Sequence, residues 1–222
     1  MNNAATPLSS SSFETARFNM VESQIRPFSV MNEQVINAFS SVAREEYIPV
    51  ERRNLAYLGG DLPMGKGRFM VEPAGYARLL QEAHIVPGMR VLDIGCLTGY
   101  TTAILSYLTA EVTGLDSVEW VMQAKNLAHQ SLNFVAGELA AGAPLQGPFD
   151  VIVLNGAVQR IPEALIAQVK EGGLIACFWR GQRSDGHGVL YHKQKNALRQ
   201  QILFDAFVPI LPGFEEQPGF IF

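Results

Sequence analysis

The sequence has 222 residues, of which 48% are hydrophobic and 17% are charged, the size and composition of one ordinary α/β domain. Such a chain buries enough apolar surface to offset the entropy lost on ordering, which excludes global disorder. A net charge of −4 leaves no excess of positive charge for a phosphate backbone, which argues against a general nucleic-acid binder.

Cysteine usage and apolar runs indicate where the protein works. Cys96 and Cys177 lie far apart and fit neither a disulfide framework nor a Cys-x-x-Cys metal site, which favours a reducing compartment. The apolar runs, such as residues 174–179, are far shorter than the roughly 18 residues needed to cross a bilayer. We therefore predict a cytoplasmic protein that is not inserted in a membrane, with residues 1–14 as a flexible N-terminal tail.

The first third of the chain is predicted to be helical and then irregular. Apolar residues recur at helical spacing in residues 15–50, and Ser29 and Asn32 are both candidate N-caps. Residues 56–71 contain four glycines and a proline, which indicates an irregular loop or short hairpin. A helix is predicted from Pro73 until Pro87-Gly88.

The middle of the chain alternates predicted strands with predicted helices. Such alternation predicts a mostly parallel sheet with helices on both faces, a three-layer doubly wound α/β fold. The last two strands have no helix of useful length between them, so we expect an antiparallel pair at the sheet edge. The expected strands are residues 90–94, 111–115, 133–136, 150–154, 174–179, 189–192 and 202–208, with helices at 99–108, 117–130 and 162–170.

One domain over residues 15–222 is expected. Its parts are an N-terminal helical extension with a loop at 15–72, a sheet core at 73–180 and C-terminal antiparallel strands at 181–222.

The most informative motif is residues 91–100, VLDIGCLTGY, an apolar strand that runs into a glycine turn opening a helix. A strand end followed by a helix N-terminus presents unpaired amides to an anionic group of a ligand. Leu97 occupies the second glycine position of the dinucleotide fingerprint, so a pyrophosphate fits poorly. Asp116 follows the next strand, where a carboxylate accepts hydrogen bonds from ribose hydroxyls. A ribose without phosphates suggests an adenosyl cofactor, although a glycine turn is often only a tight connection and an acid there often only an N-cap.

The order strand, Asp93, glycine turn, helix, strand, Asp116 is that of class I methyltransferases, Rossmann-like enzymes that use S-adenosyl-L-methionine. The chain also resembles the protein-L-isoaspartate O-methyltransferase family from about Met20 to Phe214. The segments that carry this resemblance are MVESQI, VAREEYIP, AYLGGDLPMGKG, VPGMRVLDIG, PFDVIVLNGA, VKEGGLI and FDAFVPI. The resemblance implies a methyltransferase that acts on a carboxylate of isoaspartyl protein or peptide and releases S-adenosyl-L-homocysteine.

The resemblance also implies residue roles. Asp93, Gly95 and Gly99 shape the pocket for the methionine end, with Cys96 near the sulfonium, and Asp116 binds the ribose. Glu138, in a Gly137-Glu138 pair, lies near the adenine amino group, and Asn155 faces the crevice. Each has a plainer alternative: Cys96 as a small buried hydrophobe, Glu138 as a solvated loop acid, and Asn155 as a turn cap.

The chain departs from the family at two places. The family's Thr-Ile-Ser-Gln-Pro is replaced by residues 69–73, FMVEP, so Val71 stands where an orienting serine is expected and Glu72 where a glutamine is. An ionised Glu72 facing the pocket would repel an anionic acceptor; otherwise it faces solvent or caps the next helix. Leu97 replaces the middle glycine and either collides with the cofactor or points away, because positive φ is costly for leucine.

These departures leave alternatives open. The chain is either an active methyltransferase, a degenerate cofactor-binding sensor or interaction protein, or a methyltransferase with a shifted acceptor. No catalytic residue is assigned. The histidine-containing stretch around Asp185, His187 and His192 favours a hairpin over a metal site, so no metal is expected.

Overall fold

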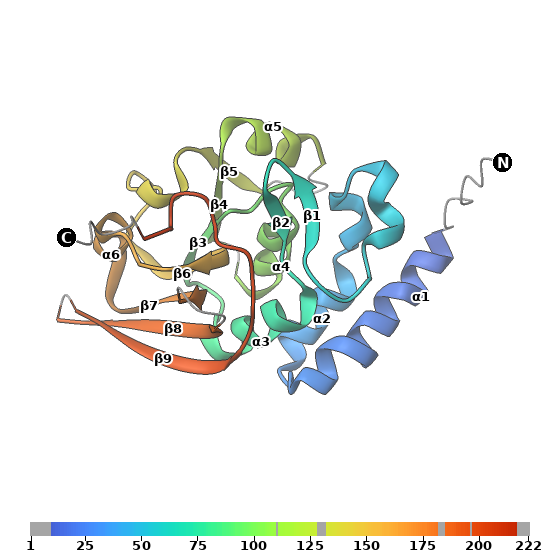
Figure 1. Cartoon of the computed structure of the whole chain (residues 1–222), viewed down its shortest axis with the longest axis horizontal. Coiled ribbons are helices and arrows are strands. Elements are labelled where there is room, and N and C mark those ends of the chain that lie inside the picture. Colours follow the sequence, from blue (N-terminus) through green and yellow to red (C-terminus); the bar gives the residue numbers. More distant parts are fainter. Residues whose placement is uncertain (1–9, 110, 128–131, 182–184, 196, 217–222) are drawn as a thin grey trace, which may run out of the picture.

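A seven-stranded, mostly parallel sheet forms the centre of the computed structural model, which describes residues 10–109, 111–127, 132–181, 185–195 and 197–216 (Figure 1). The strand order is β5-β4-β3-β6-β7-β8-β9, and a separate antiparallel hairpin is formed by β1 and β2. The strands are β1 (Leu62–Gly65), β2 (Arg68–Met70), β3 (Arg90–Ile94), β4 (Glu111–Asp116), β5 (Asn133–Ala136), β6 (Phe149–Val158), β7 (Val169–Arg180), β8 (Gly186–Gln194) and β9 (Ala197–Asp205).

The connections of the sheet confirm the predicted α/β fold. Strands β3 to β7 pair in parallel, and β8 and β9 add an antiparallel edge. Strand order reverses at β3, which has β4 on one side and β6 on the other. Ligands of open α/β sheets bind outside the carboxyl ends of the strands at such a reversal, which marks the end of β3 as the place to look for a site.

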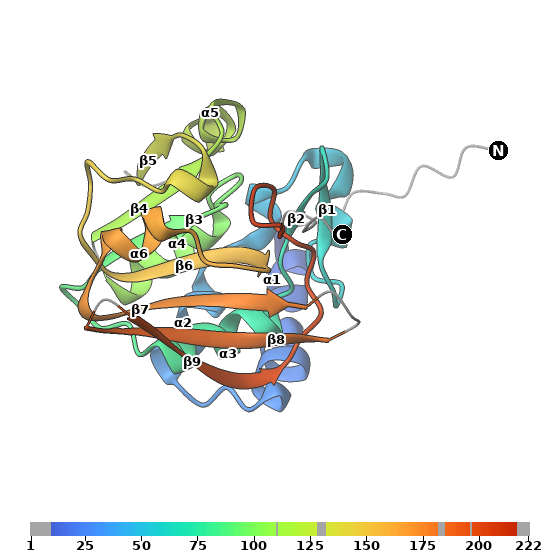
Figure 2. The same cartoon turned by 60° about the vertical axis from the view of Figure 1, so that its left-hand side comes forward.

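Side chains of the central strands alternate between two apolar layers. Val151 and Val153 of β6 pack into the layer with the N-terminal helices, whereas Ile152 and Leu154 pack into the opposite layer with α6 and the C-terminal residues. A strand that is buried on both faces reads as an unbroken apolar run, as residues 151–154 do. Figure 2 shows the sheet between these layers.

In the part of the chain that the structure describes, six α-helices and several short helical turns surround the sheet. The α-helices are α1 (Ser10–Met20), α2 (Glu33–Ser41), α3 (Pro73–Ala83), α4 (Tyr100–Leu108), α5 (Val118–Leu127) and α6 (Glu163–Gln168). The short turns are η1 (Val21–Ile25), η2 (Arg26–Phe28), η3 (Arg44–Tyr47), η4 (Val50–Leu55) and η5 (Leu139–Ala141). No helix among these described segments is long and apolar enough to cross a membrane.

The N-terminal region differs from its prediction. Helix α1 begins at Ser10, so residues 10–14 of the expected flexible tail are helical, with the partly buried Phe13 and Ala16 and the buried Met20 at helical spacing. Residues 1–9 lie outside the described chain. The expected continuous helical pattern is broken by η1 and η2, where Pro27 and the left-handed Ser29 interrupt the ladder. Ser29 is therefore not a helix cap.

Strand boundaries also shift outward. β7 begins at Val169, five residues before the expected start, because Val169 pairs with Phe149 of β6 before a bulge. The predicted edge strands extend to β8 and β9, but β9 ends at Asp205 rather than at residue 208. Residues 128–130 of the helix predicted at 117–130 lie outside the described chain.

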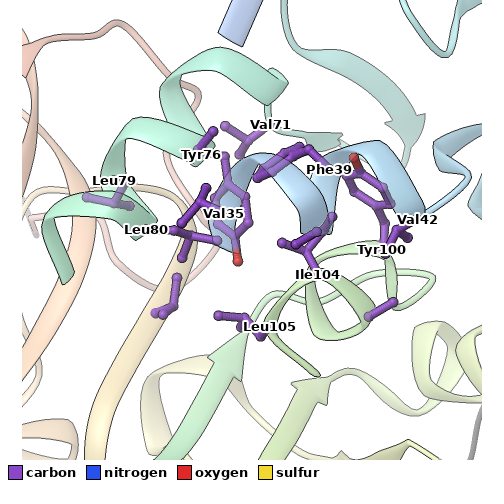
Figure 3. Close-up of a cluster of buried hydrophobic side chains, with 14 of the residues drawn as sticks. Val35, Phe39, Val42, Val71, Tyr76, Leu79, Leu80, Tyr100, Ile104 and Leu105 are labelled. Carbon is purple, nitrogen blue, oxygen red and sulfur yellow. The ribbon is translucent and has the colours of Figure 1, made fainter. Parts of the chain in front are cut away.

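A single apolar cluster holds α2, α3 and α4 together (Figure 3). Val35, Phe39 and Val42 face Tyr76, Leu79 and Leu80 of α3 and Tyr100, Ile104 and Leu105 of α4. Phe39 makes edge-to-face contacts with Tyr76 and Tyr100, an arrangement that aromatic pairs favour. Val71 joins the same cluster at the start of α3, which fixes the segment that follows the β1–β2 hairpin.

Asn32 caps α2, so its replacement tests how much this end of the core depends on the helix start. Its side-chain oxygen accepts bonds from the amides of Gln34 and Val35 at 2.9 and 3.3 Å. Asn32→Ala is expected to lower the free energy of unfolding by about 1 kcal/mol. The exposed Gln34→Ala is the control and is expected to change it by less than about 0.5 kcal/mol. Equal effects in urea unfolding would contradict the capping role.

Candidate cofactor and active site

Asp93 lies at the carboxyl end of β3 and is fully buried. Its carboxylate accepts hydrogen bonds from the hydroxyls of Thr101 and Thr102 at 2.9 and 2.6 Å and from Asn155 Nδ2 at 2.5 Å. Burial raises the pKa of Asp93 to about 6, while these three donors act in the opposite direction. The carboxylate therefore ties the first turn of α4 to β3 and β6.

Asn155 lies within β6, and its amide orientation is set by its neighbours. Nδ2 donates to Asp93 and to the Ile94 carbonyl at 3.0 Å, and both are acceptors, so the amide nitrogen must face them. Oδ1 is buried and has no hydrogen-bond partner among the described residues. Asn155, Arg68 and Val71 line a cavity of about 10 Å³, about the size needed for one water molecule. Asn155 thus lies in β6 beside the end of β3 and does not cap a turn.

The glycine turn between β3 and α4 has left-handed backbone at three positions. Gly95 has φ of 79°, Gly99 has φ of 92°, and Leu97 has φ of 51°. A Cβ on Gly99 would lie 2.8 Å from the Phe134 ring, so glycine is required there. The expectation that leucine avoids positive φ at position 97 is wrong: the Leu97 amide donates to Asp116 Oδ2 at 2.8 Å and the side chain is buried, and both contacts hold the strained backbone.

The amides of this turn are paired within the chain. Gly95 N and Cys96 N donate to the Leu115 carbonyl, and Gly99 N donates to the Cys96 carbonyl. The sequence predicts unpaired amides that would bind an anionic ligand group. In the described conformation the amides of residues 95, 96, 97 and 99 have acceptors within the chain, so these four are not among the unpaired amides that the sequence predicts.

Asp116, at the end of β4, is fully buried and bound by an arginine that the sequence argument missed. Arg68 donates from Nη1 to Oδ1 at 2.8 Å and from Nη2 to Oδ2 at 2.9 Å. Oδ1 also accepts from the Ser117 amide and Oδ2 from the Leu97 amide, each at 2.8 Å. Arg68 opens the otherwise apolar stretch Arg68-Phe69-Met70-Val71, and a lone cation in such a strand was the available signal.

The other cofactor candidates differ in position. Gly137 N donates to the Asp116 carbonyl at 3.0 Å, which brings the end of β5 to the same edge. Glu138 is solvent-exposed at the start of η5 and makes no side-chain capping bond there. Cys96 is buried beside Val121, Ala124 and Phe134, and burial raises the pKa of its thiol. Its surroundings are those of a small hydrophobe.

On the acceptor side, Val71 is buried in the core and Glu72 is half-buried. Asp61 Oδ1 accepts from the Glu72 amide at 3.0 Å. Burial raises the pKa of both carboxyls, and the charge of Asp61 further raises the pKa of Glu72, while Arg44 lowers both. Glu72 Oε1 lies 3.3 Å from where a Cβ on Gly75 would stand, so it folds over the start of α3 without a capping bond.

The histidines of β8 take part in local contacts. His187 Nδ1 lies 3.0 Å from Asp205 Oδ1 and its ring stacks on Trp179, while His192 contacts Gln201. Within the part of the chain that the structure describes, no group of three potential metal-ligating side chains comes together.

Because Leu97 has a positive φ, glycine is predicted to be more stable than alanine at this position. Leu97→Ala removes buried apolar volume and is expected to cost about 2–5 kcal/mol. Leu97→Gly loses the same packing but relieves the left-handed strain, so it should be more stable than Leu97→Ala by about 1 kcal/mol. At the buried strand residue Leu154 the order should reverse, with glycine less stable than alanine. The measurement is urea unfolding of the four variants, and a less stable glycine at position 97 would contradict the assignment.

The raised pKa of Asp93 gives a pH prediction. Between its ordinary pKa of 3.8 and about 6, the folded protein binds the proton more tightly than the unfolded chain, so stability falls as pH rises. At 1.36 kcal/mol per pKa unit this amounts to on the order of 3 kcal/mol. Asp93→Asn removes the group, so wild type should lose stability relative to this variant from pH 4 to 6, measured by chemical unfolding. Parallel curves would contradict the prediction.

Comparisons with known proteins agree with this architecture. A sequence model of the family described as protein-L-isoaspartate(D-aspartate) O-methyltransferase matches residues 16–211. A protein-L-isoaspartate O-methyltransferase from Koribacter versatilis is 33% identical over 166 residues, covering 72% of this chain and 75% of that protein. One from Gloeobacter violaceus is 32% identical over 197 residues, covering 86% of this chain and 96% of the relative.

Solved structures show the same fold. A protein-L-isoaspartate O-methyltransferase structure has a TM-score of 0.74 at 23% identity, covering 90% of this chain and 66% of the other. A β-aspartate methyltransferase from Plasmodium falciparum in complex with S-adenosyl-L-homocysteine has a TM-score of 0.70 at 19% identity, covering 90% of this chain and 97% of the other. With the family match over residues 16–211, the chain belongs to the protein-L-isoaspartate O-methyltransferase family.

Proposed function

We propose that this chain is an S-adenosylmethionine-dependent O-methyltransferase that esterifies the carboxylate of isoaspartyl residues in proteins or peptides. The observation that carries the proposal is the family match over residues 16–211, which spans both the β1–β2 hairpin and the β3–α4 turn. Relatives from two bacteria bear this activity in their names. Cys96 and Cys177 are both free and lie far apart in the sequence, which supports action in a reducing compartment such as the cytoplasm.

The proposed cofactor residues gather at the carboxyl edge of β3, β4, β5 and β6. The hydrogen bonds that Asp93 accepts from α4 and that Asp116 accepts from the glycine turn support roles in shaping this edge. Glu138 has the least support, because its side chain is exposed and unfixed by a capping bond. The proposed set is Asp93, Gly95, Cys96, Gly99, Asp116, Gly137, Glu138 and Asn155.

In the described conformation these residues do not fit the cofactor. All four hydrogen bonds made to the Asp116 carboxylate come from the chain itself, which leaves no acceptor for ribose hydroxyls. The cavity beside Asn155 measures about 10 Å³. Pockets that bind small molecules such as this cofactor measure about 300–1,000 Å³. Cofactor binding therefore requires a different arrangement of the residues that cover this edge.

The acceptor side is consistent with chemistry that needs no general base. A carboxylate with an ordinary pKa near 4 is already ionised at neutral pH, so its reaction requires positioning more than proton removal. Val71 provides no hydroxyl to orient such a group. Glu72 and Asp61 would repel it, by about 1 kcal/mol at 4 Å in water and about 4 kcal/mol at an effective dielectric constant of 20.

The direct test is methyl transfer to a synthetic peptide. Wild-type protein, labelled S-adenosylmethionine and an isoaspartyl peptide should give a base-labile methyl ester, and the same peptide with ordinary aspartate should not. Transfer at the level of the enzyme-free blank for wild type and for the Glu72→Gln variant, both at high protein concentration, would overturn the proposal.

Glu72→Gln should increase this activity because it removes the carboxylate expected to repel the acceptor. The repulsion above corresponds to a gain of about fivefold to a thousandfold in kcat/KM for the isoaspartyl peptide. Adding Val71→Ser restores the missing hydroxyl and should raise activity further. The exposed Glu51→Gln is the control for loss of one acid and should leave the rate unchanged. An unchanged rate in both Glu72 variants would show that these positions do not set acceptor choice.

A second candidate function is favoured by one observation. Arg68 and the chain's own amides already occupy the Asp116 carboxylate, which favours a degenerate family member that binds the cofactor or its demethylated product without turnover, as a sensor or interaction protein. Titration calorimetry with S-adenosyl-L-homocysteine distinguishes the candidates. Binding without methyl transfer to any acceptor supports a sensor, and methyl transfer excludes it.

A further inference from the structure

Arg68 reaches from the β1–β2 hairpin into the carboxyl edge of the main sheet. The hairpin turn is Lys66-Gly67, with φ of 51° and 71°, and positive φ at both positions is what a two-residue type I′ turn requires. Arg68 is the first residue after the turn and pairs across the hairpin with Gly65. The turn therefore places the arginine at the tip of a two-stranded element that is separate from the main sheet.

Arg68 forms a buried ion pair with Asp116. Its guanidinium makes two parallel hydrogen bonds to Asp116, at 2.8 and 2.9 Å, and the two side chains are 8% and 0% exposed. Two-pronged arginine–carboxylate pairs are among the strongest hydrogen-bonded contacts, and burial protects this one from screening by salt. Lys66 on the same hairpin offers a contrast, because its ion pair with Glu119 is exposed on both sides.

Arg68 also covers the glycine turn. Its Nη2 lies 3.2 Å from where a Cβ on Gly95 would stand, and Leu211 Cδ2 lies equally close from the C-terminal segment. Leu211 is held by β-bridge hydrogen bonds of its segment to Ala157 at the end of β6. A cavity of about 10 Å³ lies between the hairpin and this segment, lined by Arg68, Asn155 and Leu211.

We propose that Arg68 is an internal latch on the cofactor site: it takes the hydrogen-bonding position of the ribose on Asp116, and the cofactor binds by displacing it. This inference rests on the proposed function, since it assigns a regulatory contact to the same site. The latch lowers the apparent affinity for the cofactor by the fraction of molecules in which Arg68 has left Asp116.

Several observations point to the hairpin as the part that moves. Gly59, Gly60, Gly65 and Gly67 flank or lie within it, and a Cβ at any of them would meet nothing within 4 Å. By contrast, the far end is fixed, because Arg44 Nη2 donates to the carbonyls of Met70 and Val71. Leu62, Met64 and Met70 hold the two strands of the hairpin in the same apolar cluster as Val71, so the part that moves is the Lys66-Gly67 turn together with the Arg68 side chain.

The test is calorimetric titration of S-adenosyl-L-homocysteine into wild type, Arg68→Gln and Lys66→Gln. Both variants lose one positive charge from the same hairpin, but only Arg68→Gln breaks the buried pair. Arg68→Gln is expected to bind at least tenfold more tightly than wild type, and Lys66→Gln within threefold of it. Because this ligand carries no net charge, a change in overall electrostatics does not produce the difference.

Arg68→Lys is a second variant in case Arg68→Gln does not fold. Circular dichroism will show whether each variant is folded. Lysine keeps the charge but makes a single-point contact, so its affinity should lie between those of wild type and a folded Arg68→Gln. Equal affinities for wild type and the Arg68 variants, or no binding by folded variants, would overturn the latch.

The outcomes for the latch and for the proposed function are separable. Tighter binding by Arg68→Gln with no methyl transfer to the isoaspartyl peptide upholds the latch and overturns the proposed function. Methyl transfer by wild type with equal binding by all variants upholds the proposed function and overturns the latch.

Discussion

Two fully buried carboxylates at the ends of neighbouring parallel strands organise this molecule. Asp93 ends β3 and Asp116 ends β4, and neither has contact with solvent. A buried charge without partners is very costly, so each must be surrounded by hydrogen-bond donors. The donors come from different parts of the chain: α4 and β6 for Asp93, and the glycine turn, the start of α5 and the β1–β2 hairpin for Asp116.

The two carboxylates solve this problem differently. Asp93 is held by neutral hydroxyl and amide donors, and burial raises its pKa. Asp116 receives a guanidinium as well as two amides, so its charge is compensated directly. Breaking one partner of a buried pair costs about 3–5 kcal/mol because the other charge stays uncompensated. Through Arg68, the hairpin therefore compensates the charge of Asp116 at the sheet edge. The hairpin also covers one side of the glycine turn, and Asp93 binds the first turn of α4, which follows it.

The carboxyl edge of the sheet combines the fold of the family with residues of this chain. The fold shared with the family supplies the strand order, and Asp93, Asp116, Arg68 and Leu97 of this chain lie together at the edge of the sheet. Leu97 is held at positive φ by its own buried side chain and by Asp116, and Glu72 lies beside Asp61 on the acceptor side. These residues set the charge and the filled volume at the places where cofactor and acceptor are proposed to bind.

The sequence by itself determined the alternating strands and helices, the antiparallel edge, the two strand-end acids and the family, because periodicity and ordered motifs are local properties of the chain. Helix and strand limits shifted where neighbours extended pairing, as at Val169, or where Phe13, Ala16 and Met20 gave α1 a packing face. Only the tertiary structure decided that Arg68 pairs with Asp116, 48 positions away, and that the turn amides are already used. Such contacts depend on which buried charge still lacks a partner once the sheet has formed. A local sequence pattern holds no information about this.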